Sequence, residues 1–584
     1  MKGPAPSAAS DRDLASIAEA RALARRAREA WLQLAEFSQD QIDAVVDAVA
    51  AAATPHAEAF ARLAVEETGY GVVEDKIQKN LFASQRVHEF IRPMRTVGVI
   101  ARHPDTGVVE IAEPFGVVAA IVPSTNPTST AIYKILIALK ARCTIVISPH
   151  PAAVKSISRV AEVLDEAARR AGAPAGSINW MTSVTLEGTQ ELMKQREVAV
   201  ILATGGMGLV RAAYSAGKPA YGVGPGNAPA FIERTADVRK AVRDVITGKT
   251  FDNGVLCSSE NSVVVDQPVA DQVREEFRAQ GSYFLNAAEM QAVAAQLVSP
   301  QRLPNPALVG KSAVHIAKAC GLSVPADTRV LVAPLEGVGR DYPLSIEKLC
   351  PVLSYYVVRD WQEGCERCKQ ILRYGGMGHT MSIHSRNEQV IQEFGLKKPA
   401  FRIVVNSPTT FGSIGLTTGL DPAMTLGCGG YGGNITSDNI SPRHLLNIKR
   451  LAYEVRTVPN RFERASGAGA PAGDAGAPRQ VGIPASALTQ RIDEFLGSRG
   501  YTDAGHSQGA PGPRPESPSL RSAARAQQPP PSPAAPLDFV CEDDVRAAML
   551  AGRTLVLAER AIVTPAAREL GEQHRVFESA PWRG

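Results

Sequence analysis

Residues 251–261, FDNGVLCSSEN, place a single cysteine between a turn-forming Asp-Asn-Gly sequence and a Ser-Ser pair. A structural cysteine normally has apolar neighbours, whereas those of Cys257 are small and polar. Asp252-Asn253-Gly254 favours a turn, so we expect Cys257 on a loop or at the start of a helix. A thiol placed there can be exposed, and nearby backbone N–H groups can lower its pKa, as a nucleophile requires. The local sequence alone leaves a nucleophile and a gap-filling cysteine equally open.

A second chemical signal follows the apolar segment VAVIL. In the sequence ATGGMG, Thr204, Gly205 and Gly206 stand where a strand would end and a helix begin. The N–H groups at such a helix start can bind the pyrophosphate of a dinucleotide. The neighbouring GVGPGN has only half of the GxGxxG dinucleotide-binding pattern. We therefore treat ATGGMG as the candidate cofactor-binding segment.

The overall composition is typical of a soluble globular protein. Of the 584 residues, 45% are hydrophobic and 21% are charged, with a formal net charge of +4. This length predicts two or more domains, and the small, scattered charge argues against nucleic acid as a partner. The sequence has no run of about 18 apolar residues, so we predict no membrane span. The N-terminal segment also lacks the apolar core of a signal peptide.

The cysteines are too sparse for a disulfide framework. There are eight in the chain, which favours a reducing cytoplasm. Cys365 and Cys368 in CERC have the spacing of a metal or redox site, but no second pair accompanies them. We interpret them as i, i+3 neighbours on a helix and predict no metal site.

Two series of strands and helices must position the candidate residues. Two helical segments come first, and residues 97–115 alternate around DTG, which predicts an antiparallel hairpin. Continuous apolar runs (GVVAAIVP, CTIVISP, SINWM, VAVILATGG) then alternate with helix-length segments and predict a parallel sheet covered on both faces. A second series follows from Ala230 with NSVVVD, VLVAPL, VLSYYVV and RIVVNSP. Two α/β domains with a cleft between them are a usual place for a small-molecule site.

The composition changes near Ser466, after which Ala, Gly, Pro, Ser and Gln dominate. Such a segment cannot bury enough apolar surface to fold alone and predicts a linker. Within it, residues 485–497 predict a short amphipathic helix. The last segment, 541–584, predicts a helix, two short strands and a second helix, with Gly552 ending the first helix and Thr564-Pro565 beginning the second.

Several long segments resemble the aldehyde dehydrogenases, and more narrowly their CoA-acylating branch. The resemblance extends from about Leu14 to Phe462 and is closest to the propionaldehyde dehydrogenases of bacterial microcompartments. It is carried, in the family's order, by ETGYGVVEDKIQKN, EPFGVVAAIVPSTNPTSTAIYK, ISPHPAA, ILATGGMGLVRAAYSAGKPAYGVGPGNAPAFI, KTFDNGVLCSSEN, EKLCPVL and TLGCGGYGGN.

The fold that this resemblance implies is an α/β aldehyde dehydrogenase fold. It has a Rossmann-like NAD-binding domain, an α/β catalytic domain and a β-hairpin oligomerisation element. The implied divisions are 1–228 for NAD binding (with the hairpin near 97–115 in the oligomerisation element), 229–421 for the catalytic thiol domain, 422–464 for the return segment and oligomerisation contacts, 465–540 for the linker and 541–584 for a targeting or docking segment. A dimer or tetramer is expected.

The resemblance also implies catalytic roles. Cys257 matches the nucleophile that attacks the aldehyde carbon, and Asn126 in PSTNPTS matches the amide that stabilises the resulting oxyanion together with the Cys257 N–H. Without the family, an asparagine before proline would favour a plain turn. His379 in GGMGHT is a candidate for a role in acyl transfer, although a lone histidine is more often structural.

For the cofactor, the resemblance implies NAD. The implied binding residues are Thr204, Gly205, Gly206, Glu347, Ser148 and Pro149. Glu347 in EKLCPVL matches the residue that holds the nicotinamide ribose. Ser148 stands where many relatives have a lysine at the adenosine ribose, which leaves the preference between NAD and NADP open.

The expected acyl acceptor depends on Val223. Hydrolytic family members carry a glutamate in ELGGKSP that activates water, whereas GVGPGNAP has Val223 at that position. A valine cannot move a proton, so we expect the thioester to persist until the thiol of coenzyme A arrives. The expected reaction is aldehyde + NAD⁺ + CoA ⇌ acyl-CoA + NADH + H⁺.

Three alternatives to this interpretation remain open in the sequence. Propionaldehyde is the expected substrate and acetaldehyde the alternative, because one methylene changes binding by only about 1–3 kcal/mol. A hydrolytic enzyme that forms free acid is a second alternative. A non-enzymatic scaffold is a third, although the chain retains both Cys257 and Asn126.

The C-terminal region resembles the encapsulation segments of microcompartment enzymes. Short amphipathic helices behind Pro/Ala-rich linkers imply shell proteins as partners and a location in the cytoplasm, within a bacterial microcompartment. The alternative is a tail whose helicity is incidental.

Overall fold

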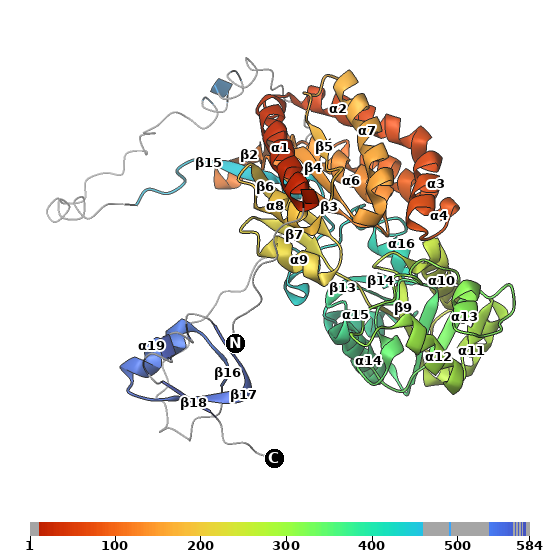
Figure 1. Cartoon of the computed structure of the whole chain (residues 1–584). Coiled ribbons are helices and arrows are strands. Elements are labelled where there is room, and N and C mark those ends of the chain that lie inside the picture. Colours follow the sequence, from red (N-terminus) through yellow and green to blue (C-terminus); the bar gives the residue numbers. More distant parts are fainter. Residues whose placement is uncertain are drawn as a thin grey trace. The chain divides into compact units, whose positions relative to one another are not determined.

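A computed structural model of the chain describes residues 11–458 and 537–564, with isolated positions in 487–494 and 567–579 (Figure 1). The chain divides into two compact units, Met1–Ala504 and Gly505–Gly584. The helix predicted at 485–497 lies mostly outside the described residues. Among the described helices, none is both long and apolar enough to cross a bilayer.

The first unit begins with helices, as predicted. These are α1 (Asp11–Leu34), α2 (Gln39–Ala53), α3 (Ala57–Thr68), α4 (Val73–Leu81) and α5 (Val87–Ile91), with a π-helical turn at Phe82–Arg86 between the last two. Alanines at helical spacing let α1 pack closely, because Ala20, Ala24 and Ala27 are fully buried. Helix α2 begins with a capping box in which Ser38 and Gln41 satisfy each other's backbone N–H groups.

A parallel sheet of five strands follows, in the order β5-β4-β3-β6-β7. Its strands are β3 (Val117–Val122), β4 (Thr144–Pro149), β5 (Ile178–Trp180), β6 (Val198–Thr204) and β7 (Ala220–Val223). The connecting helices are α6 (Pro127–Lys140), α7 (Val154–Arg170), α8 (Leu186–Lys194) and α9 (Met207–Tyr214). Helices α6 and α7 pack on one face and α1, α8 and α9 on the other. The strand order reverses between β3 and β6. In open parallel sheets, ligands bind beyond the carboxyl ends of the strands where the order reverses, so we expect a binding site there.

The second parallel sheet has seven strands in the order β10-β11-β12-β9-β8-β13-β14. These are β8 (Ala228–Ile232), β9 (Glu260–Asp266), β10 (Ser282–Phe284), β11 (Val330–Pro334), β12 (Val352–Val358), β13 (Gly378–His384) and β14 (Ala400–Val405). Its helices are α10 (Val238–Thr250), α11 (Ala270–Ala279), α12 (Ala287–Leu297), α13 (Ala313–Ala319), α14 (Trp361–Tyr374), α15 (Glu388–Leu396) and α16 (Thr409–Ser413). CERC lies on α14 with both thiols buried, as the helix interpretation predicts. Among the described residues, no group of side chains forms a metal site.

The predicted hairpin at 97–115 is confirmed as β1 (Gly98–His103) and β2 (Val108–Pro114). A distant segment, β15 (Leu446–Ala452), adds a third antiparallel strand beside β2. The return segment and the hairpin therefore form one sheet. Its function in oligomerisation stays a prediction, as do the proposed domain boundaries.

The C-terminal unit contains a small parallel sheet in the order β16-β17-β18. Its elements are β16 (Leu537–Val540), α19 (Glu542–Leu550), β17 (Leu555–Val563) and β18 (Phe577–Ser579). The predicted first helix and its stop at Gly552, which has φ +60°, are confirmed. The prediction of two short strands was wrong, because β17 is one continuous strand. The second predicted helix, after Thr564-Pro565, lies mostly outside the described residues.

Candidate active site

Cys257 lies on the turn between Phe251–Gly254 and β9, and it lines a cavity of the first unit. The cavity has a volume of about 460 Å³ and lies at the carboxyl ends of β3, β4, β6 and β7. Asn126, Glu347 and Val223 line it together with Cys257. Residues far apart in the sequence therefore meet at one site.

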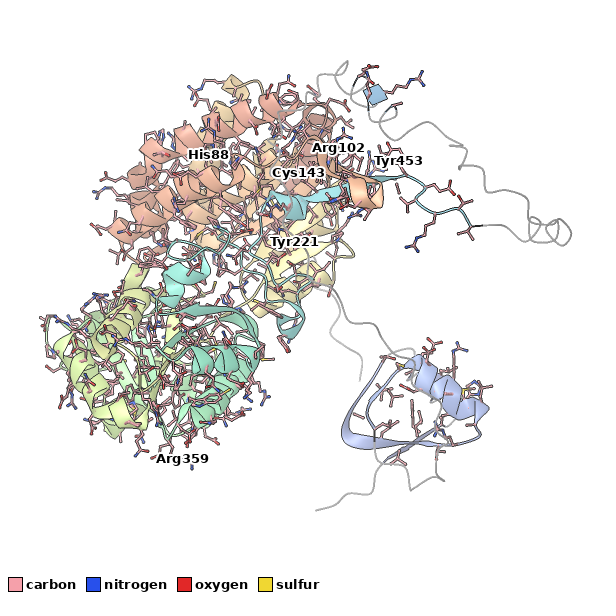
Figure 2. All side chains as sticks on the ribbon, turned by 180° about the vertical axis from the view of Figure 1, so that it is seen from behind. His88, Arg102, Cys143, Tyr221, Arg359 and Tyr453 are labelled. Atoms are coloured by element: carbon pink, nitrogen blue, oxygen red, sulfur yellow. The ribbon has the colours of Figure 1, made fainter. Side chains whose placement is uncertain are left out.

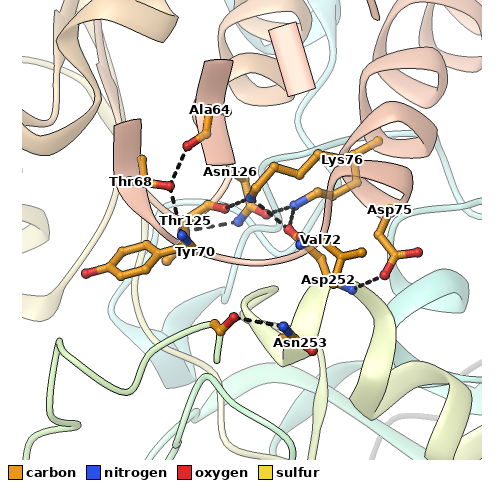
Figure 3. Close-up of polar contacts among 12 residues, drawn as sticks. Ala64, Thr68, Tyr70, Val72, Asp75, Lys76, Thr125, Asn126, Asp252 and Asn253 are labelled. Atoms are coloured by element: carbon orange, nitrogen blue, oxygen red, sulfur yellow. Dashed lines mark hydrogen bonds and ion pairs between the residues drawn. The ribbon is translucent and has the colours of Figure 1, made fainter. Parts of the chain in front are cut away.

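Asn126 is the residue before α6, where the chain leaves β3. Its Oδ1 accepts a hydrogen bond of 2.6 Å from Lys79 Nζ, and its Nδ2 donates one of 3.2 Å to Thr125 Oγ1. Figure 3 shows Asn126 beside Thr125, close to Lys76 and Asp252. Lys79 of α4 therefore holds the oxygen of the Asn126 amide, and Asn126 also lines the cavity.

The Cys257 thiol differs from expectation in its acidity. Burial raises its pKa to about 12, the nearby Glu347 and Cys428 raise it further, and Arg402 opposes them. The prediction that backbone N–H groups lower this pKa was wrong in net effect, because desolvation outweighs them. The residue Cys257 is nevertheless partly exposed and lines the cavity, as a nucleophile requires.

Glu347 faces the nucleophile across Gly226. The Gly226 N–H donates a 2.8 Å hydrogen bond to Glu347 Oε1, and burial raises the pKa of this carboxyl to about 8. A Cβ at Gly226 would lie 2.1 Å from the Cys257 carbonyl oxygen and 3.2 Å from His379 Cγ. Only glycine therefore fits where these three residues approach one another.

His379 is fully buried on β13 and does not line the cavity. Its Nδ1 lies 3.0 Å from Thr380 Oγ1, while its Nε2 has no hydrogen-bond partner among the described residues. Burial, and then Arg402, lower its pKa to about 3, so the ring is neutral near pH 7. The structure brings His379 close to the backbone of the nucleophile turn but leaves it outside the cavity lining.

The glycine-rich segment after β6 forms another part of the lining. Thr204, Gly205 and Gly206 all line the cavity, and α9 begins directly after Gly206, as predicted. The Thr204 hydroxyl oxygen is buried without a hydrogen-bond partner among the described residues. A Cβ at Gly206 would meet nothing within 4 Å. An unpartnered hydroxyl beside an open helix start fits the pyrophosphate of a dinucleotide.

Ser148 and Pro149 close β4 and also line the cavity. The Ser148 hydroxyl is already paired, at 2.8 Å, with Thr189 Oγ1 and is fully buried. It is therefore engaged within the protein. No lysine or arginine occurs among the described residues that line the cavity.

Much of the chain is similar to known proteins. The sequence profile described as "Aldehyde dehydrogenase family" matches residues 8–413. The chain belongs to the aldehyde dehydrogenase family. Its mixed α/β architecture of parallel sheets is the fold of that family.

Among curated family members, the chain is 42% identical over 448 residues to the bifunctional aldehyde-alcohol dehydrogenase AdhE of Escherichia coli (strain K12), covering 76% of this chain and 50% of that protein. It thus spans about half the length of several curated relatives that it matches. It is 38% identical over 431 residues to the succinate-semialdehyde dehydrogenase (acetylating) of Clostridium kluyveri, covering 74% of this chain and 95% of that protein.

Two solved family structures are also similar. An acetylating aldehyde dehydrogenase from Geobacillus thermoglucosidasius has a TM-score of 0.76 and 49% identity, over 78% of this chain and all (100%) of that one. A propionaldehyde dehydrogenase from the fucose utilisation microcompartment of Clostridium phytofermentans has a TM-score of 0.67 and 29% identity, over 74% of this chain and 96% of that one.

In this aldehyde dehydrogenase, Val223 ends β7 and lines the same cavity as Cys257. Its side chain is apolar and almost fully buried, with 2% exposure. Among the described lining residues, Glu347 is the one carboxyl group.

The sequence indicated no role for the lysines of VEDKIQKN, and none for Asp252 beyond its place in the turn. In the structure Lys76, Lys79 and Asp252 form a buried ion cluster behind Asn126. Lysines on a helix usually indicate a solvated face. The sequence feature that could have indicated this cluster is that all three residues lie in segments that resemble the family.

Proposed function

We propose that this protein oxidises a short-chain aldehyde to an acyl-CoA, with reduction of NAD, through a thioester on Cys257. The observation that carries the proposal is the apolar Val223 in the cavity beside Cys257, where a water-activating glutamate would otherwise stand. Similarity to proteins named as acetylating or acylating supports it.

In this proposal the Cys257 sulfur, as thiolate, attacks the aldehyde carbon. The carbonyl oxygen becomes an oxyanion, which the Asn126 amide and the Cys257 N–H stabilise. NAD, when bound, supplies a hydride acceptor, and the acyl group remains as a thioester on Cys257. The thiol of coenzyme A then attacks the acyl carbon and the Cys257 sulfur leaves. His379, which lies close to the backbone of the nucleophile turn, is the candidate for a role in acyl transfer.

The cofactor side of the cavity favours NAD over NADP. The 2′-phosphate of NADP needs a cation, and no lysine or arginine is among the described lining residues. Thr204, Gly205 and Gly206 would hold the pyrophosphate, and Glu347, which the raised pKa leaves protonated near pH 7, would hold the nicotinamide ribose. Pro149 and Ser148 would border the adenosine.

Apolar side chains around the nucleophile support a small apolar aldehyde. Val255 and Leu349 line the cavity; Val255 belongs to a buried cluster with Phe251, Leu256 and Val309, and the partly buried Leu349 packs against it. We assign propionaldehyde as the substrate. Acetaldehyde is a second candidate, because several similar proteins are named as acetylating enzymes or aldehyde-alcohol dehydrogenases.

We further propose an oligomeric enzyme in the cytoplasm, inside a bacterial microcompartment, with the C-terminal region binding shell proteins. The similarity to a microcompartment propionaldehyde dehydrogenase supports this assignment. The end of α19 carries Leu550 at 91% exposure, which fits a docking contact.

Stopped-flow measurement of NADH with C2 to C5 aldehydes, with and without coenzyme A, tests the proposal. Without coenzyme A we expect a burst of about one NADH per active site followed by slow turnover, because Val223 supplies no base. With coenzyme A, turnover should be sustained and mass spectrometry should detect acyl-CoA. Sustained free-acid formation without coenzyme A would identify the enzyme as hydrolytic.

A further inference from the structure

Helix α4 carries two lysines that reach the loop of the nucleophile. Lys76 and Lys79 are buried, with 1% and 2% exposure, and both contact the fully buried Asp252. The Lys76 Nζ lies 2.9 Å from Asp252 Oδ2, and Lys79 Nζ contacts the same oxygen. Asp252 belongs to the turn that leads to Cys257, so α4 is tied directly to that turn.

The same two lysines also hold the segment before α6. Lys76 Nζ donates a 3.1 Å hydrogen bond to the Thr125 carbonyl oxygen, and Lys79 Nζ donates one of 2.6 Å to Asn126 Oδ1. Figure 3 shows Lys76, Asp252, Thr125 and Asn126 converging on this point. The cluster therefore joins Asn126, which follows β3 of the first sheet, to the turn that precedes β9 of the second sheet.

A lysine ammonium has only donors, and this determines how the Asn126 amide is oriented. The oxygen of the amide must face Lys79, so its NH₂ group must face the other way. Burial lowers the pKa of Lys79 to about 7, although the contact with Asp252 opposes this shift, and it is the protonated side chain that has only donors. If the amide turned over, its oxygen would face the cavity and would repel an oxyanion instead of stabilising it.

The turn itself has an uncommon backbone conformation. Asp252 and Asn253 have φ of +51° and +53°, in the left-handed region, which Asp and Asn adopt more readily than other non-glycine residues. Such residues persist only when the surroundings fix them. Asp252 Oδ1 accepts a 2.7 Å hydrogen bond from the Val72 N–H, and its own N–H donates one of 2.7 Å to Asp75. Gly71 permits this approach, because a Cβ there would lie 1.9 Å from Asp252 Oδ1.

We propose that Lys79, anchored by Asp252, is a positioning residue that selects the orientation of the Asn126 amide and sets its place relative to Cys257. The inference rests on the proposed aldehyde oxidation, in which Asn126 stabilises the oxyanion. Lys79 touches neither the substrate nor the thiol and acts through Asn126.

Replacing Lys79 with methionine tests the assignment, because the side chain keeps its length but loses its donors. Relative to the wild type, Asn126→Ala should slow the NADH burst by roughly 100- to 1,000-fold, as for one lost oxyanion donor. Lys79→Met should slow it by about 10-fold or more, with the Kd for NAD changed by less than about twofold. Adding Lys79→Met to Asn126→Ala should slow the burst by less than a further factor of about two, because both changes act on one group.

Lys140→Met is the matched control. Lys140 is also a fully buried lysine with an aspartate partner, Asp43, but it lies at the opposite end of α6 from Asn126. We expect it to lower the melting temperature and to leave the burst rate unchanged. Should Lys79→Met fail to fold, Asp252→Asn, which keeps an acceptor for Val72, should show the same coupling to Asn126→Ala.

The possible outcomes separate this inference from the proposed function. A normal burst in Lys79→Met, an additive loss in the double variant, or an equal loss in Lys140→Met would each overturn the positioning role. Absence of a burst in the wild type with every aldehyde would overturn the proposed function, and the inference with it.

Discussion

On the cofactor side of the cavity the Thr204 hydroxyl is left free, whereas on the nucleophile side the Asn126 amide is held by hydrogen bonds (Figure 2 shows the side chains of the chain from behind). The cofactor side consists of Thr204, Gly205 and Gly206, where a buried hydroxyl has no partner among the described residues and space beyond Gly206 is open. The nucleophile side consists of Asn126 and Cys257, and its supporting residue Asp252 accepts from three separate N–H donors. Polar groups that bind a ligand are left without partners inside the protein. Polar groups that must keep a fixed position form hydrogen bonds to other groups of the protein.

The largest expected effect comes from removing the nucleophile. Cys257→Ala should abolish NADH formation from aldehyde, because no covalent adduct can form, and should leave the Kd for NAD within about twofold because the cofactor side is unchanged. Stopped-flow absorbance and a fluorescence titration with NAD measure the two effects. Turnover like that of the wild type would show that Cys257 is not the nucleophile.

The acidity of the thiol is a second way to examine the nucleophile side. Because the raised pKa of about 12 leaves little thiolate at neutral pH, alkylation of Cys257 by iodoacetamide in the cofactor-free enzyme should rise about tenfold per pH unit. From pH 7 to pH 9.5 this amounts to a change of roughly 300-fold without a plateau. Ionisation of Glu347, whose pKa is raised to about 8, adds negative charge nearby and should make the slope slightly shallower.

Peptide mass spectrometry follows this reaction at Cys257 alone. That selectivity matters because Cys320 and Cys541 are also partly exposed. A plateau below pH 9 would mean that backbone N–H groups do lower the thiol pKa, as the sequence suggested.

The sequence predicted the continuously apolar strands and the alternating hairpin β1–β2, and it missed strands such as β13 and β15. β3, β6 and β9 follow from their β-branched runs, since a sheet covered on both faces demands them. β13 alternates polar residues, GHTMSIH, that are nonetheless fully or almost fully buried, and β15 exists through its pairing with the distant β2. β17 was expected as two strands because charged residues interrupt its apolar pattern.

The candidate site shows the same limit. Family resemblance indicated Cys257 and Asn126, and the structure places both in one cavity. Nothing in the local sequence distinguishes Lys79 from a solvated helix lysine, because its burial depends on Asp252 arriving from another part of the chain. The raised pKa of Cys257 was missed for the same reason, since desolvation is set by the tertiary surroundings.

A smaller effect should distinguish a free hydroxyl from an engaged one. Thr204→Val removes a hydroxyl without a described partner, so the cofactor-free enzyme should keep its melting temperature while the Kd for NAD rises about 2- to 10-fold. Thr189→Val is the matched control, because the Thr189 hydroxyl bonds both Ser148 Oγ and the Thr185 carbonyl oxygen at 2.8 Å. That change should destabilise the enzyme by about 1–2 kcal/mol. Equal melting-temperature losses in both variants would remove the contrast between the two hydroxyls.

The smallest effect on catalysis is expected from removing the C-terminal region, which supplies no described residue to either side of the cavity. A chain that ends at Phe462 should keep kcat and KM within about twofold, since the last lining residue along the sequence is Leu349. Steady-state kinetics on the truncated and full-length enzymes measure this effect. A large loss of kcat would show that the C-terminal region supports the site.

The same truncation should abolish co-purification with microcompartment shells, because the docking surface would be lost while the enzyme stays intact. In the C-terminal unit Val545 is fully buried in the core, so the face of α19 that contains it is not available to a partner. Leu550, at 91% exposure, is the most exposed apolar side chain described on α19. An exposed leucine at a helix end can insert into an apolar groove of a partner, so the docking contact should depend on it.

Leu550→Asp should therefore weaken shell association of a reporter protein fused to residues 466–584, without changing the circular dichroism of the fusion. Arg546→Ala is the matched control on the same helix, since that exposed side chain pairs only with Glu542 among the described contacts and should leave association unchanged. Co-sedimentation of each fusion with purified shells measures the difference. If the truncated enzyme still enters shells, or if the Leu550→Asp fusion associates normally, docking does not depend on this surface.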